Sequence, residues 1–200
     1  MRPSRPQLFI ALAVLVVGMW LSATTVIPMS IEELSSTATQ IIRGHAIDSR
    51  SAWDDQHSAI YTYTRFQTDE TLRGSNNAVI TVKQLGGSAG GYTLHVAGVH
   101  SWNKGEDAVL FLRPSQAQDG TSAVIGLMQG DFRLRRSASG EIMADNGLHL
   151  SAATVMSPES DTHAYNPSTK QVTAYSGSQL TLRQLEGRIH AALAGGKNPQ

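Results

Sequence analysis

The sequence feature that most constrains the fold is the strict alternation of side-chain types between residues 59 and 74. In "AIYTYTRFQTDETLRG" two sets of residues alternate: Ile60, Thr62, Thr64 and Phe66, and between them Tyr61, Tyr63, Arg65 and Gln67. β-Branched and aromatic side chains favour extended backbone, and alternate side chains of a strand lie on opposite faces of a sheet. The stretch therefore predicts a long β-strand with one core-facing row and one outward row.

Further extended segments follow the same pattern. Turn-forming glycine, asparagine and proline separate them, and they cover residues 39–49, 78–86, 92–98, 108–114 and 122–136. Gly44, inside the first segment, predicts a β-bulge or a close approach of two backbones. Many short strands with helices only at the ends predict a mainly β fold: a small antiparallel OB-like (Greek-key) barrel over residues 30–150.

One helix is expected at each end of this barrel. An S-x-x-E capping box at residues 30–33 predicts a short helix over residues 31–38. An amphipathic helix is expected over residues 177–196, with Ser178 as its N-cap, after a polar loop or linker at residues 151–176. Its apolar stripe has residues spaced three or four apart: Leu182, Leu185, Ile189 and Leu193.

Residues 1–27 have the pattern of an export segment. Arg2 and Arg5 precede the uncharged stretch Leu8–Ile27, and a positive start before an apolar run is typical of exported chains. A membrane anchor needs about 20 apolar residues, and this stretch just reaches that length, so a cleaved signal peptide and an uncleaved anchor both stay open. We expect the remaining chain to lie outside the cytoplasm, as a periplasmic, secreted or membrane-anchored protein that contacts the membrane only through this segment.

Charge and cysteine content exclude several function classes. After residue 27 the chain has 14 basic and 16 acidic residues, a net charge of −2, without the basic stripe that nucleic acid requires. The absence of cysteine excludes disulfides, thiolate nucleophiles and cysteine-ligated zinc. No phosphate-binding loop or dinucleotide fingerprint occurs, so no cofactor is predicted.

The stretch Gly86–Gly90 matches G-x-S-x-G, the pattern of a hydrolase nucleophile elbow centred on Ser88. An elbow requires a helix after the serine, whereas "YTLHV" alternates as a strand does. Asp131 and His149 follow Ser88 in the chain order serine, acid, histidine of a catalytic triad. The match consists of that order alone. We interpret the glycines as a strand-to-strand connection, with a small envelope hydrolase using Ser88 as the alternative.

Seven histidines raise the question of a metal site, and none of them has the helical spacing of a metal-binding motif. Asp54, Asp55 and His57 are able to gather on one turn. We interpret that turn as a solvated loop beside Trp53, so no metal is predicted, and a histidine-based metal site belongs to the hydrolase alternative.

The outward row of the alternating strand is the best candidate for a binding surface. Tyrosine is enriched at protein contacts, and Tyr61 and Tyr63 are followed on the same face by Arg65 and Gln67. Trp53, in the preceding turn, is added to this candidate site. The alternative is that both tyrosine rings cover the barrel beneath a terminal helix.

Several phrases of the chain resemble a recurring family of exported bacterial proteins of unassigned function and, more distantly, the netrin-like module of the tissue inhibitors of metalloproteinases. The resemblance lies in "IIRGHAI", "IYTYTRFQTDETLRG", "ITVKQLGG", "GEDAVLFL" and "VIGLMQGDFRL". It implies a five-stranded OB-type barrel that binds a partner. In those inhibitors an amino-terminal cysteine chelates the protease zinc, and because this chain has no cysteine the resemblance does not carry that mechanism.

Together these features predict a non-enzymatic, exported binding module of the cell envelope. Its expected partner is an extracytoplasmic protein or peptide, and association with an envelope protease is one version of that hypothesis.

Overall fold

The computed structural model describes residues 28–117, 119–147 and 180–195. The predicted export segment, the linker at residues 151–176, Ser178 and His149 lie outside the described residues. No helix within the described ranges combines the length and the apolar character that crossing a membrane requires.

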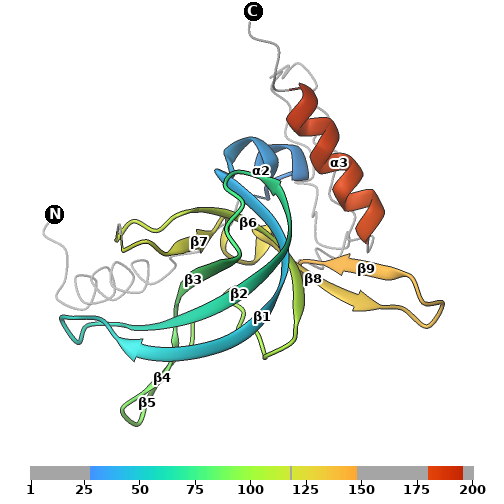
Figure 1. The fold of residues 1–200 in the computed structure, drawn as a ribbon. Helices are drawn as coiled ribbons and strands as arrows, with labels where there is room; N and C mark the ends of the chain where they lie inside the picture. The colour runs from blue at the N-terminus through green and yellow to red at the C-terminus, as the bar shows by residue number, and fades with distance from the viewer. Residues whose placement is uncertain (1–27, 118, 148–179, 196–200) are drawn as a thin grey trace, which may run out of the picture.

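Five strands close into a barrel (Figure 1). Their order around the barrel is β1 (Gln40–Trp53), β2 (Ile60–Arg73), β3 (Val79–Leu85), β7 (Ser122–Val124) and β6 (Asp107–Pro114), which pairs back with β1. This confirms the predicted mainly β, OB-like barrel. One pairing of the barrel is parallel and the others are antiparallel: β3 and β7 run in the same direction, with Val82 opposite Ser122, because the chain crosses from one to the other through β6.

The remaining strands extend this sheet or lie beside it. The sheet continues from β6 through β8 (Asp131–Arg136), β9 (Ile142–Asp145) and β10 (Leu180–Thr181). A separate hairpin follows β3 and consists of β4 (Gly87–Ala89) and β5 (Tyr92–Leu94). The 3-10 helix η2 (Leu127–Gly130) separates β7 from β8, so the extended segment expected over residues 122–136 is two strands.

Both predicted helices form. Helix α2 (Ile31–Thr37) begins with the predicted capping box, in which Ser30 and Glu33 exchange side-chain hydrogen bonds with each other's backbone N–H. Helix α3 (Leu182–Gly195) begins five residues later than expected. The reason is that residues 180–181 pair with β9, and the Thr181 hydroxyl then accepts the N–H of Gln184 at 3.2 Å as the cap.

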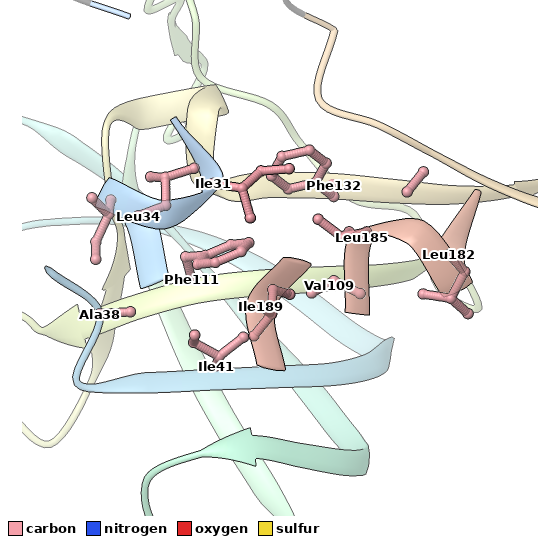
Figure 2. Close-up of a cluster of buried hydrophobic side chains, with 12 residues drawn as sticks. Ile31, Leu34, Ala38, Ile41, Val109, Phe111, Phe132, Leu182, Leu185 and Ile189 are labelled. Carbon is pink, nitrogen blue, oxygen red and sulfur yellow. The ribbon is translucent and has the colours of Figure 1, made fainter. Parts of the chain in front are cut away.

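Two hydrophobic clusters lie on opposite sides of β6, which explains its uninterrupted apolar run. Ala108, Leu110 and Leu112 point into the barrel, whereas Val109 and Phe111 point outward to the helices. Figure 2 shows the outer cluster, with Phe111 and its neighbours facing side chains of α2 and α3. A strand that is buried on both faces has no polar alternation, and Ala108 to Leu112 are all fully buried.

Gly44 marks a close approach of two backbones, as predicted. A Cβ atom at this position would lie 2.2 Å from the Gln67 carbonyl oxygen on β2. The pairing of β1 with β2 also shifts register between Arg43 and Gly44, where Asp69 is the extra residue on β2. Such a bulge bends a strand and re-aims its side chains.

Candidate functional site

Strand β1 has two halves with different neighbours. Residues Ile41–His45 pair with β6 as well as with β2. Ala46 makes the last contact on that side, where its N–H donates to the Glu106 carbonyl, just before β6, at 2.9 Å. Ile47 is then a bulge, since it has no opposite residue on β2. Beyond it, Asp48–Trp53 pairs only with Ile60–Arg65. We call these two segments the distal arm; in Figure 1 its tip lies on the side of the molecule away from α2 and α3.

The free edge of the distal arm is the side of Asp48–Trp53 that faces away from β2, and it pairs with no strand of the described ranges. Across the hairpin, the Asp54 N–H donates to the Ala59 carbonyl at 2.9 Å, so the Asp54 backbone faces β2. Consecutive residues of an antiparallel strand direct their N–H and C=O groups to opposite sides. The residues whose backbone groups face away from β2 are therefore Trp53, Ser51 and Ser49. This edge offers donors and acceptors to an added strand.

The predicted outward row lies on the outer face of β2, but a lysine covers its tyrosines. Tyr63 is opposite Lys83 in the register between β2 and β3. The Lys83 ammonium lies 4.6 Å from the centre of the Tyr61 ring and 5.5 Å from that of Tyr63, within the range of cation–π attraction. It also bonds to Asp119 at 2.9 Å, so the lysine is held in place over the rings.

The electrostatics of this face come from paired charges. Hydrogen bonds from Thr121 and then Lys83 lower the pKa of the Asp119 carboxyl to about 2, and the bond to Asp119 raises the pKa of Lys83. Arg65 is paired with Asp48 at 2.8 Å. The face is therefore polar and aromatic, and Lys83 and Arg65 are each held in an ion pair.

Arg50 is a third cation on the outer face, in addition to Lys83 and Arg65. Its guanidinium carbon lies 5.4 Å from the centre of the Tyr63 ring, and the side chain is exposed. It stands beside the free edge, where a partner strand would pass. Gln67 ends the row opposite His45, next to the barrel body.

The inner face of the distal arm is lined by hydroxyl groups. Ser51 and Thr62 are hydrogen-bonded at 2.8 Å, and Ser49 and Thr64 at 3.0 Å. Strand β4 lies over this face, because a Cβ atom at Gly87 would be 2.3 Å from the side-chain oxygens of Ser51 and Thr62. The arm is thus backed by the β4–β5 hairpin and not by a large apolar core.

Trp53 does not belong to the tyrosine row. It lies opposite Ile60, so it shares the inner face, where its ring stacks on His57 at 6.0 Å and meets Tyr92 edge-to-face at 5.7 Å. Tyr92 is 67% exposed. The structure therefore separates the predicted site residues into an outer tyrosine row and an aromatic cluster at the tip of the arm.

Ser88 occupies the middle of β4, and no helix follows it. It is opposite Thr93, to which its hydroxyl is hydrogen-bonded at 2.8 Å. The connection between β4 and β5 is Gly90–Gly91, both with positive φ, the conformation of a two-residue hairpin turn. This confirms the interpretation as a strand-to-strand connection. Asp131, named as a triad acid, is buried and bonded to Trp102.

Asp54, Asp55 and His57, which the sequence places on one turn, do not form a metal-binding group. Asp54 instead accepts hydrogen bonds from Ser58 and the Ala59 N–H within its own turn. A different group was missed: one ring nitrogen of His45 and one oxygen each of Asp69 and Asp107 lie within 4.8 Å of one another.

This three-residue group comes from three strands. Asp107 on β6 is opposite His45 on β1, and Asp69 is the bulged residue on β2. The three positions are separated by 24 and 38 residues along the chain. Only the correct barrel register, including the bulge, places them together, and no local spacing in the sequence carries that signal. Lys83 was missed for the same reason, because it meets the tyrosines across a strand pair.

Neither a scan against protein-family models nor a search of curated proteins found a match to this chain.

Proposed function

We propose that this chain is an exported, non-enzymatic binding module of the cell envelope, and that it holds an extended segment of a protein or peptide partner along the free edge of the distal arm. The export part of the proposal is supported by the sequence of residues 1–27. The binding part is supported chiefly by one observation: the edge of Asp48–Trp53 that has no partner strand within the described ranges.

An unpaired strand edge favours strand addition. The backbone groups of Ser49, Ser51 and Trp53 supply affinity that is independent of the partner's sequence, and side chains on the two faces supply specificity. On one face a partner strand would meet Arg50 and Tyr63, and on the other it would meet Trp53 and Tyr92. Aromatic and arginine side chains are the types most enriched among strongly contributing contacts.

The resemblance to the netrin-like module adds weight to a binding role, since the loops and open face of OB-type barrels commonly hold ligands. Attachment to an envelope protease is one version of this proposal. The candidate residues are then Tyr61, Tyr63, Arg65, Gln67 and Trp53, with the edge as the place where the partner's backbone docks.

Proline substitution at the edge tests the proposal. Ser49→Pro removes an N–H that faces away from β2, so the hairpin keeps its own hydrogen bonds, whereas an added strand loses a donor and meets the proline ring. Ser49→Ala is the matched control, because it removes the same hydroxyl and keeps the N–H. Short unstructured peptides selected from a displayed library on the full-length chain in mild detergent are the probes.

We expect Ser49→Pro to weaken binding of the selected peptides at least about tenfold, because losing one edge contact should cost more than about one kcal/mol of binding free energy. Ser49→Ala should bind these peptides as the parent does. Both variants lose the Ser49–Thr64 hydrogen bond, so their thermal midpoints should match each other. Equal binding by the proline variant, or a parent that selects no peptide, overturns the proposal.

The tyrosine row is tested separately by replacing Tyr61 and Tyr63 together with alanine. If the outer face contributes specificity, the double variant binds the selected peptides more weakly but still responds to Ser49→Pro. If the double variant and the parent bind equally, the row is removed from the site.

A further inference from the structure

We propose that His45, Asp69 and Asp107 bind a divalent cation of the borderline class that includes Zn²⁺, at the root of the distal arm. The three side chains lie on adjoining strands, and their ligand atoms are within 4.8 Å of one another. His45 is half-buried, and the two aspartates are exposed.

The spacing of the ligand atoms fits one ion. Zinc binds imidazole nitrogen and carboxylate oxygen at about 2.0–2.2 Å, so two ligands of the same ion lie roughly 3–3.5 Å apart. His45 Nδ1 is 3.3 Å from both carboxylate oxygens of Asp69. Asp107 reaches the same place from the opposite neighbour strand, so a cation would draw on all three strands with only small side-chain rotations.

The ligand types decide the class of cation. Mg²⁺ and Ca²⁺ favour sites built from oxygen alone, whereas an imidazole beside carboxylates suits zinc and its neighbours. The two carboxylates balance the charge of a dication. The nearby Arg43 does not oppose this, because it is paired with Glu70 at 2.8 Å and Glu186 at 3.3 Å.

The group also opens onto space for further ligands. Asp69 and Asp107 line an open groove of about 260 Å³, which is also lined by Leu134 and by three arginines, Arg43, Arg135 and Arg136. A three-residue site that faces a groove leaves coordination positions for water. The geometry therefore gives an open site and not a closed structural one.

The position of the group predicts a mechanical effect. His45 is the last β1 residue paired with β6, and the bulge at Ile47 follows it. An ion held by β1, β2 and β6 would tie the arm to the barrel where β1 leaves β6. Because the three ligands converge only in the folded chain, binding should raise the thermal midpoint.

Zinc titration of the full-length chain in mild detergent tests the inference, by calorimetry and by thermal unfolding. We expect the parent to bind Zn²⁺ with a rise in thermal midpoint and to bind Mg²⁺ far more weakly. His45→Gln and Asp107→Asn should each weaken Zn²⁺ binding at least about tenfold and reduce that rise.

Two substitutions elsewhere serve as controls for the loss of a histidine or an aspartate. His95→Gln removes an exposed imidazole and Asp55→Asn an exposed carboxylate, neither of them in the group. Both should bind Zn²⁺ as the parent does. The inference is overturned if the parent does not bind Zn²⁺, if Mg²⁺ binds as tightly, or if the control variants lose as much affinity as His45→Gln.

Discussion

The two halves of β1 have the same backbone conformation and opposite surroundings. Ile41–His45 is paired on both edges, with Ile41 packed against the helices and Ile42 inside the barrel. Asp48–Trp53 is paired on one edge, and small hydroxyl side chains line its inner face. One strand thus serves as core and as exposed edge, and the Ile47 bulge separates the two.

This contrast shows where the free energy of folding comes from. Buried apolar area stabilises the barrel body. The distal arm is held by backbone pairing between its two segments and with β3, and by short side-chain hydrogen bonds, which contribute little net free energy each. Regions with few buried apolar contacts open at lower cost than the core and are commonly the parts that bind.

The largest difference between the two regions should appear on truncating aromatic rings. Phe111→Ala removes a fully buried ring between β6 and the helices and should lower the free energy of unfolding by about 3–5 kcal/mol. Tyr92→Ala removes a mostly exposed ring of β5 that packs against Trp53 of the arm and should cost less than about 1 kcal/mol. Urea unfolding of both variants measures this, and similar losses would show that the arm has a core of its own.

A buried acid in the body makes stability depend on pH. Asp131 is 2% exposed, and burial, with the nearby Glu106 adding to it, raises the pKa of its carboxyl to about 7 against the bond from Trp102. The folded chain therefore holds this proton more tightly than the unfolded chain does. Its contribution to stability is complete below about pH 4 and is lost as the pH rises towards 7.

Asp131→Asn should remove that pH dependence. The amide oxygen still accepts the Trp102 N–H without a charge, so the variant should be more stable than the parent by a few kcal/mol above pH 7 and should lose the difference towards pH 4. Asp55→Asn, at an exposed acid of the turn beyond the arm, should leave the slope unchanged. Unfolding in urea between these pH values decides it, and parallel curves for the parent and Asp131→Asn would contradict the burial argument.

The smallest effects should come from two glycines that both have open space around them. Gly187 is exposed in helix α3, and alanine there should stabilise the fold by up to about 1 kcal/mol because no atom lies within 4 Å of the new Cβ. Gly91 has φ of +82° in the turn between β4 and β5, so alanine there should cost about 1 kcal/mol. Thermal unfolding of the two variants should give midpoint shifts of opposite sign.

Much of the architecture was predictable from local patterns. The alternation at residues 59–74 predicted β2 and both of its faces, and the capping box predicted the first turn of α2. The candidate site was predictable only in part. The tyrosine row could be read from one strand, but Lys83 and Asp119 reach it from β3 and from the connection that follows β6, and the order of strands around a barrel is not written in any one of them.

The sequence by itself determined the main strands, the capping box of α2, the turn glycines and the apolar face of α3, because each depends on residues within a few positions of one another. Tertiary structure decided the rest. Barrel closure put Ile41 and Ile42 into different cores, left the edge of Asp48–Trp53 without a partner strand in the described ranges, and brought His45, Asp69 and Asp107 together. These outcomes depend on register between distant strands, and a shift of one residue would turn each side chain to the other face.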